Sequence, residues 1–192
     1  GPVMVEIPAD IAEADSSELI HQNYIPSSRL RSGADVNDVS KAAELLLAAN
    51  FPVIYAGQGI IYADACDELV ELAELTKIPV TTTMAGKGAI DERHDLALGS
   101  SSVVMNGAVL KYMQRADTIL AVGTSLTQHG MITTIPAGKK IIHATNFAED
   151  IGNYYSPDSA LLGDAKLVLR QLIEACEDLL STRQQRISPA DE

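Results

Sequence analysis

The stretch PVIYAGQGI, from Pro52 to Ile60, decides the fold of this 192-residue chain. It is an apolar run of strand length that leads directly into a turn, Gly57-Gln58-Gly59, and a helical pattern rich in Ala, Leu and Glu follows from Ala63. Glycines let the backbone turn sharply and let a ligand approach it closely, and the free N–H groups of a following helix favour an anion. The stretch therefore predicts a strand–turn–helix unit suited to a phosphate. Plain turn geometry is the alternative for the same glycines.

The dinucleotide-binding fingerprint is incomplete in this chain. That fingerprint reads G-x-G-x-x-G/A and has an acidic residue about 20 positions further on. Here Tyr62 occupies the third small position, and Thr81, Thr82 and Thr83 stand where the acidic residue is required. The sequence thus leaves both possibilities open, a phosphate site and a purely structural turn.

Composition excludes several classes of partner. The formal net charge is −12 and the pI is about 4.6, which argues against nucleic acid and anionic membranes because both need basic patches. No run of about 18 apolar residues occurs, so no membrane span is predicted. The opening GPVMVEIP has neither a basic start nor a long apolar segment, so no signal peptide is expected. Hydrophobic residues make up 46% of the chain, enough for one domain with a sizeable core.

The two cysteines, Cys66 and Cys176, fall on the faces of predicted helices. Their spacing matches neither a metal site nor an obvious disulfide. We expect two buried thiols in a reducing, cytoplasmic environment and no zinc.

Short apolar strands alternate with amphipathic helices along the chain. The predicted strands are 3–7, 51–56, 78–83, 118–122, 140–144 and 160–162. The predicted helices run from Asp35 or Asn37 to about residue 50, and over 64–76, 105–115 and 165–180. Residues 9–32 have the composition of a linker, and 91–102 that of a loop. The alternation predicts a three-layer α/β/α fold of Rossmann-like type, with about six mainly parallel strands.

Loops rich in glycine, hydroxyl and amide groups follow the predicted strands. In open parallel sheets the loops after the strands meet at the carboxyl edge, where ligands bind. We therefore predict a nucleotide-binding cleft formed by these loops, although glycine and threonine also suit any single loop. The candidate cofactor-binding residues are Gly57, Gln58, Gly59, Thr82, Thr83, Gly86, Gly123, Thr124, Ser125, Asn146, Gly163 and Asp164.

Four segments occur in a specific order: PVIYAGQGI, ELAELTKIPVTTTMAGKGAIDERHDLALG, ADTILAVGTSL and GDAKLVLRQLI. Together they resemble the central domain of thiamine-diphosphate-dependent enzymes of the acetolactate synthase and pyruvate oxidase superfamily. The opening GPVMVEIPADI is similar to the segment that closes the preceding domain in that family. The resemblance implies three regions: 1–33 as the end of a preceding domain and linker, 34–180 as the central domain, and 181–192 as a flexible tail. We expect the chain to be a piece of a longer enzyme.

The resemblance also implies an activity, with its chemistry outside this chain. The parent enzyme would be a lyase or transferase that cleaves or forms a C–C bond of a 2-keto acid. Family members hold thiamine diphosphate and Mg²⁺ between their other domains, in part through a GDG…N motif. No GDG occurs here, because Gly163-Asp164-Ala165 is a different element. We therefore expect no catalytic residue and no metal ligand in this chain. The expected partners are the other domains of the enzyme, within a homodimer or homotetramer.

Central domains of this family differ in their ligand: some bind FAD, others ADP or CoA-type molecules, and others none. Flavin-binding members carry an arginine after the strand that matches ADTILAVG, where this chain has Gly123-Thr124-Ser125. They also carry an H-I-D-x-D-like run, where this chain has HATNF from His143 to Phe147. The missing charges favour an ADP-type nucleotide or an empty cleft over FAD.

Two other functions fit the same architecture. A sirtuin-like NAD-binding domain shares the sheet, but that family usually carries a four-cysteine zinc site, which two cysteines cannot form. A purely structural oligomerisation domain without a ligand is the third possibility. His143 ends an apolar strand, and we expect it to be a hydrogen-bonded structural histidine.

Overall fold

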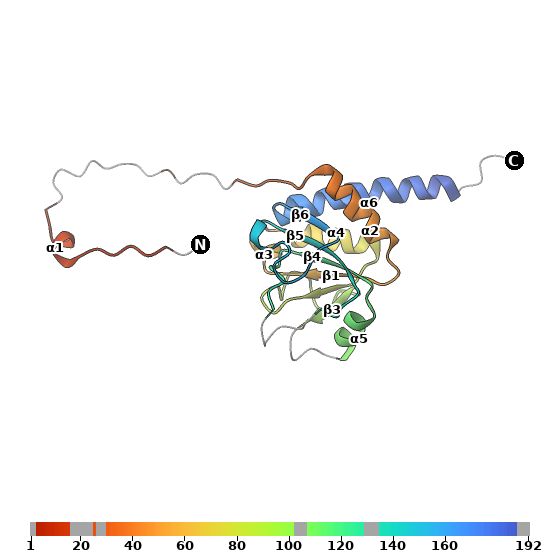
Figure 1. Ribbon diagram of the computed structural model, residues 1–192, viewed down its shortest axis with the longest axis horizontal. Coiled ribbons are helices and arrows are strands. Elements are labelled where there is room, and N and C mark those ends of the chain that lie inside the picture. Colours follow the sequence, from red (N-terminus) through yellow and green to blue (C-terminus); the bar gives the residue numbers. More distant parts are fainter. Residues whose placement is uncertain (1–2, 16–24, 26–29, 102–106, 129–134, 188–192) are drawn as a thin grey trace. The chain divides into compact units, whose positions relative to one another are not determined.

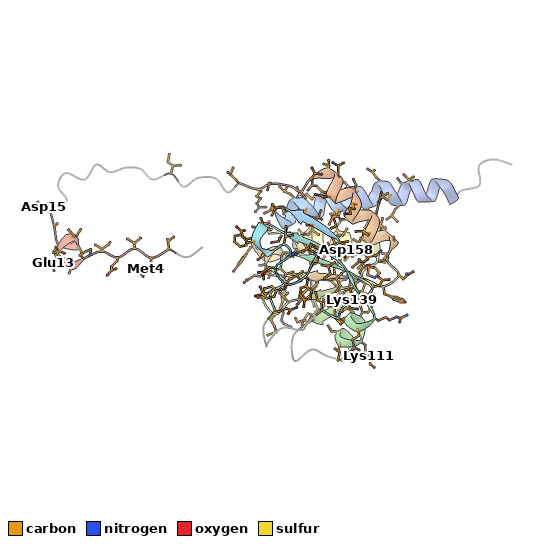
Figure 2. All side chains as sticks on the ribbon, viewed as in Figure 1. Met4, Glu13, Asp15, Lys111, Lys139 and Asp158 are labelled. Atoms are coloured by element: carbon orange, nitrogen blue, oxygen red, sulfur yellow. The ribbon has the colours of Figure 1, made fainter. Side chains whose placement is uncertain are left out.

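The computed structural model describes residues 3–15, 25, 30–101, 107–128 and 135–187. The chain divides into two compact units, residues 1–30 and 31–192. In its described residues, the first contains one short helix, α1 (Ala9–Ala12). The strand predicted over residues 3–7 is wrong: this segment has no regular structure, and Met4 (labelled in Figure 2) is 89% exposed. A strand needs a partner for its N–H and C=O groups, and the described residues of this unit supply none.

The second unit is built on a six-stranded, all-parallel sheet with the order β3-β2-β1-β4-β5-β6. Its strands are β1 (Pro52–Ala56), β2 (Val80–Thr82), β3 (Ala97–Ser100), β4 (Thr118–Val122), β5 (Lys140–Thr145) and β6 (Ser159–Leu162). The sheet confirms the predicted α/β class with parallel strands.

Helices cover both faces of this sheet unequally. They are α2 (Val36–Ala48), α3 (Gly59–Tyr62), α4 (Cys66–Thr76), α5 (Gly107–Arg115) and α6 (Ala165–Ile187), with a 3-10 turn, η1, over Ala148–Asp150. In Figure 1, α2, α4 and α6 gather on one side of the sheet, and α5 lies on the other. Alternate side chains of each strand point to opposite faces, so Ile54 packs with the three-helix core and Val53 with the α5 core.

Specific contacts fix the helix ends. Asp35 caps α2, because its carboxylate accepts a hydrogen bond from the N–H of Asn37 at 2.8 Å. At the C-terminal end of a different helix, α5, the Lys139 ammonium (Figure 2) donates to the carbonyls of Gln114 and Ala116. A cation at this position satisfies carbonyls that have no partner within the helix.

The elements differ from the sequence predictions at three places. The predicted loop 91–102 contains strand β3 in its described part, and this strand supplies the sixth strand of the sheet in place of 3–7. A short helix, α3, starts at Gly59, immediately in the glycine turn. Helix α6 continues to Ile187, beyond the predicted end at residue 180. Residues 105–106 of the predicted third helix and residues 188–192 of the predicted tail lie outside the described residues.

Candidate functional site

The strand order places the candidate site at the carboxyl edge, between β1 and β4. From β1 the chain proceeds outward to β2 and β3, and from β4 outward to β5 and β6. Such a reversal is a topological switch point, where the loops diverge and ligands bind in open α/β sheets. In this protein, however, the loops that carry Gly57 and Gly123 follow these two strands and contact each other.

The two loops pack backbone against backbone. The N–H of Gly57 donates to the carbonyl of Val122 at 2.9 Å, and that of Gly59 donates to the carbonyl of Gly123 at 2.8 Å. A Cβ added at Gly57 would lie 2.2 Å from the Gly123 carbonyl oxygen, and one at Gly59 would lie 2.7 Å from the Gly123 Cα. Gly123 itself has a φ of +65°, which favours glycine. The glycines are therefore required by the contact between the loops.

This contact reduces the number of backbone N–H groups that the glycine turn can donate to an anion. Two of its N–H groups already have internal acceptors, and the helix that follows, α3, has only four residues. The predicted helix start at Ala63 is wrong: the N–H of Ala63 donates back to the carbonyl of Gly59 at 2.9 Å and closes α3. Gln58 remains exposed at the tip of the turn.

The hydroxyl groups after β2 are used inside the protein. The Oγ1 of Thr82 lies 3.0 Å from the Oγ of Ser100 on β3. The Oγ1 of Thr83 accepts a hydrogen bond from the N–H of Gly86 at 2.9 Å, and a Cβ at Gly86 would lie 2.5 Å from the carbonyl oxygen of Ala56. Thr82 thus joins β2 to β3, while Thr83 and Gly86 hold the loop after β2 against the end of β1.

The loop after β4 is ordered by its own side chains and by His143. The Oγ1 of Thr124 accepts from the N–H of Leu126 at 3.3 Å, and the Oγ of Ser125 lies 2.7 Å from the Oγ1 of Thr127. The Nε2 of His143 donates to the carbonyl of Thr124 at 2.8 Å, which assigns the proton to Nε2. The predicted structural role of this buried histidine is thus confirmed.

Burial controls the chemistry of His143. It is 1% exposed, and burial lowers the pKa of its imidazole, while its hydrogen bond to Thr124 acts in the opposite direction. Its Nδ1 has no hydrogen-bond partner among the described residues. The side chain is therefore a neutral imidazole that joins β5 to the loop after β4.

The remaining candidate residues lie after β5 and β6. Asn146 is exposed. Gly163 donates to the carbonyl of Thr145 at 2.9 Å, and a Cβ there would lie 2.9 Å from the carbonyl oxygen of Ser32. The carboxylate of Asp164 accepts from the N–H of Lys166 at 3.2 Å and so caps α6. Gly163 and Asp164 therefore have structural contacts of their own.

Sequence reasoning missed a clamp that fastens the start of the second unit to α6. The side-chain amide of Gln171 accepts from the N–H of Ala34 at 2.9 Å and donates to the Ala34 carbonyl at 3.0 Å. Arg31 donates to the carbonyl of Ala63 at 3.1 Å, and its guanidinium lies 3.7 Å from Asp164. The sequence holds no signal for these pairs, because Gln171 and Ala34 are 137 positions apart.

A buried carboxylate between α4 and α6 was also missed. Glu68 is 5% exposed, and its Oε1 lies 2.9 Å from Arg170 and 3.5 Å from Lys166. A nearby groove of about 420 Å³ is lined by Asp67, Val70, Glu71, Glu74, Leu75 and Glu177. Four of these six residues are acidic, so the groove is unsuited to a phosphate.

Among the described residues, no group of three or more His, Cys, Asp or Glu side chains is arranged to hold a metal ion. None of the helices described in this chain combines the length and the apolar character that a membrane crossing requires.

Comparisons with known proteins agree with this architecture. A family model described as "Thiamine pyrophosphate enzyme, central domain" matches residues 39–172. The acetolactate synthase of Mycobacterium bovis is 33% identical over 180 residues, which cover 90% of this chain and 28% of that protein. The glyoxylate carboligase of Escherichia coli O157:H7 is 32% identical over 186 residues, which cover 93% of this chain and 30% of that protein.

A solved structure shares the fold. The crystal structure of benzoylformate decarboxylase from Polynucleobacter necessarius superimposes with a TM-score of 0.67 at 22% identity, over 82% of this chain and 30% of that one. This chain thus spans about 30% of the length of the proteins it matches.

Proposed function

The chain belongs to the family of thiamine pyrophosphate enzyme central domains, and on this basis we propose that it is the central, mainly structural domain of an enzyme that cleaves or forms a C–C bond of a 2-keto acid. The observation that carries the proposal is the family match over residues 39–172. Two relatives named for carboligation chemistry, acetolactate synthase and glyoxylate carboligase, support the substrate class. The sirtuin-like alternative is not favoured by these comparisons.

The thiamine diphosphate and its Mg²⁺ are proposed to bind outside this chain, in the full-length enzyme. The chain contains no GDG sequence, and the described part shows no cluster of metal-ligating side chains. The residues present therefore do not fit the diphosphate–Mg²⁺ group. We assign no catalytic step and no metal ligand to them.

Consumption of 2-keto acids by the full-length polypeptide that carries this domain tests the proposal. Pyruvate, glyoxylate and benzoylformate are supplied with thiamine diphosphate and Mg²⁺, and each cofactor is omitted in turn. We expect turnover of at least one acid that disappears when thiamine diphosphate is left out. Turnover that is independent of thiamine diphosphate, or no turnover of any of the three acids, would contradict the proposed activity.

Nucleotide binding at the carboxyl edge is the second candidate function. The exposed amide side chains of Gln58 and Asn146, which follow β1 and β5, favour it. The use of the Gly57 and Gly59 N–H groups within the protein opposes it, as does the absence of a cation from Gly123-Thr124-Ser125. We rank an ADP-type nucleotide above FAD at this edge, and the structural role above both.

A thermal-shift screen with ADP, FAD, CoA and NAD separates these two candidates. A ligand present at 100 times its dissociation constant stabilises the folded state by about 2.7 kcal/mol. Gln58→Glu is the matched variant, because the exposed carboxylate would repel a phosphate without touching the packed glycines. A shift that Gln58→Glu abolishes would establish the nucleotide site, whereas the structural role predicts no shift at millimolar ligand.

We propose that the full-length enzyme is cytoplasmic and works as a homodimer or homotetramer. The two cysteines support the first part: Cys66 and Cys176 are both free thiols, as expected in a reducing compartment. Cys176 is buried as predicted, whereas the predicted burial of Cys66 is wrong, because this side chain is only partly buried. The family resemblance supports the second part. Sedimentation of the full-length enzyme measures its subunit number.

A further inference from the structure

An acidic groove lies on α4 and α6, two helices that pack against each other on one side of the sheet (Figure 1). It has a volume of about 420 Å³, and we call it the α4–α6 groove. Five of its six lining residues come from α4 and one comes from α6. They are Asp67, Val70, Glu71, Glu74, Leu75 and Glu177. All six line the same hollow and therefore form one surface.

The acidic side chains from α4 form a row along the groove. Asp67, Glu71 and Glu74 recur at i, i+4 and i+7, so they lie on one face of the helix. The helical rise gives this row a length of about 10 Å. All three side chains are exposed, as is Glu177 across the groove on α6. The row is therefore accessible to a partner.

The acidic row has little neutralisation from within the protein. Among the described residues, one ion pair reaches it, between His94 Nε2 and Glu74 Oε1 at 3.1 Å, whereas Asp67, Glu71 and Glu177 have none. Like charges four positions apart disfavour a helix. Glu74 also lies in the last turn of α4, where the helix dipole favours a cation. A bound cationic partner would relieve both effects.

Glu68 shows how α4 accepts cations from a helix. Its Oε1 accepts a hydrogen bond from Arg170 Nε at 3.0 Å and lies 3.5 Å from Lys166 Nζ, and these two cations stand four positions apart on α6. Its Oε2 is buried and has no hydrogen-bond partner among the described residues. Glu68 lies three positions before Glu71 and so borders the groove. The acidic row continues along α4 past the carboxylates that the two α6 cations contact.

The floor of the groove is apolar. Val70 and Leu75 are partly buried and pack against the hydrophobic core. A bare metal ion needs several oxygens that converge on one point, and the described residues contain no such group of side chains. Acidic walls over an apolar floor instead match an amphipathic partner.

We propose that the α4–α6 groove binds a basic amphipathic helix of another protein. Its Lys or Arg side chains pair with the acidic row, and an apolar side chain packs on Val70 and Leu75. Basic residues at i, i+4 and i+7 of that helix have the same spacing as the row. A second copy of this chain is the less suitable occupant, because it carries 14 Lys and Arg against 26 Asp and Glu. The inference is independent of the proposed 2-keto acid activity.

A designed peptide tests the groove. The probe is a fluorescein-labelled amphipathic peptide of about 15 residues, a length that can form a helix, with Lys at i, i+4, i+7 and i+11 and Leu beside them. Fluorescence anisotropy measures its dissociation constant for the 192-residue chain and for the full-length polypeptide. Salt at about 0.15 M screens long-range attraction to the net charge.

Two pairs of substitutions remove the same charge from different places. Glu71→Gln with Glu177→Gln neutralises the groove, and we expect it to weaken binding at least about tenfold. The matched control, Glu44→Gln with Glu149→Gln, removes two exposed carboxylates from α2 and η1. We expect the control to weaken binding by at most about twofold.

Four results would overturn the inference. Equal weakening by the two pairs would show attraction to the net charge alone. Equal binding of a peptide with the same composition in scrambled order would exclude a helical match. Binding to the 192-residue chain but not to the full-length polypeptide would show that the groove is covered within the enzyme. The absence of binding at millimolar peptide would show that the groove is no docking site.

Folding controls and a second readout keep the test decisive. Circular dichroism and the melting temperature check each variant, and Glu71→Gln alone replaces the groove pair if that pair fails to fold. Val70→Thr, which is nearly isosteric, makes the floor more polar and should also weaken binding. The 2-keto acid assay is run separately. Peptide binding without turnover would remove only the proposed activity, whereas turnover without peptide binding would remove only the docking site.

Discussion

Gly57 and Gly123 touch through their backbones, since a Cβ on Gly57 would stand 2.2 Å from the carbonyl oxygen of Gly123. That same carbonyl accepts the N–H of Gly59 at 2.8 Å. The glycine turn that suggests a phosphate site in the sequence is thus first of all the joint between the loops after β1 and β4. At the switch point of the sheet, the loops after β1 and β4 therefore contact each other directly.

Gly57→Ala is expected to destabilise the fold by about 1–3 kcal/mol, toward the upper end of this range because the neighbour that must move is backbone and cannot rotate away. Urea unfolding followed by circular dichroism measures the free energy. Gly107→Ala is the control: a Cβ there meets nothing within 4 Å, and the change should stay within about 1 kcal/mol. Equal effects of the two substitutions would show that the joint is loose.

Gln171→Ala is expected to cost about 1–3 kcal/mol, since it leaves the backbone N–H and C=O of the buried residue Ala34 without their partner. The exchange of the Ala34 amide hydrogen should accelerate in the same variant. Gln114→Ala, on the exposed side of α5, should change the stability by about 0.5 kcal/mol or less. An unchanged exchange rate at Ala34 would contradict the clamp.

Leu46→Ala is expected to cost about 2–5 kcal/mol, because Leu46 is 1% exposed in the core between α2, α6 and the sheet. Leu110→Ala makes the same chemical change at a side chain that is 43% exposed, and its cost should be clearly smaller. A loss below about 0.5 kcal/mol for Leu46→Ala in denaturant melts would show that the α2 face is misassigned.

The stability should depend on pH through His143. Burial lowers the pKa of this imidazole in the folded state below the unfolded value of about 6.5. As the pH falls, the unfolded chain therefore binds the proton before the folded chain does. The contribution of neutral His143 to the free energy of unfolding is complete above about pH 6.5. It is lost as the pH falls from there toward the folded pKa, with a slope of at most about 1.4 kcal/mol per pH unit.

His143→Gln isolates this effect from the carboxylates, because a glutamine amide still donates to Thr124 but does not titrate. Unfolding free energies between pH 7 and 5 should fall less steeply in the variant than in the parent. Identical slopes would show that His143 does not contribute.

The sequence predicts the sheet well wherever a strand is buried on both faces. β4 is predicted at its observed bounds, and β1 and β5 to within one residue, because their continuous apolar runs have no other stable environment. The edge strand β3 is missed, since its residues Ala97–Ser100 are half-buried, include a glycine with positive φ, and form a strand only by pairing with β2. The opposite error at residues 3–7 has the same cause: apolar composition alone does not supply a partner strand.

The sequence predicts where the candidate loops lie, but not which contacts they make. The rule for open parallel sheets places the loops correctly at one edge, yet it does not say whether their N–H groups face a ligand or a neighbouring loop. That depends on how closely the two backbones approach, as where the N–H of Gly59 reaches the carbonyl of Gly123 at 2.8 Å. The clamp by Gln171 depends on the final packing of α6, which no local pattern specifies.

Release of CO₂ from 2-keto acids, measured in parallel for the 192-residue chain and the full-length enzyme with thiamine diphosphate and Mg²⁺, tests the central claim most directly. We expect release by the full-length enzyme from at least one of pyruvate, glyoxylate and benzoylformate. For the 192-residue chain alone we expect no release above a control without protein. Release by the 192-residue chain itself would contradict the assignment of this domain to a structural role.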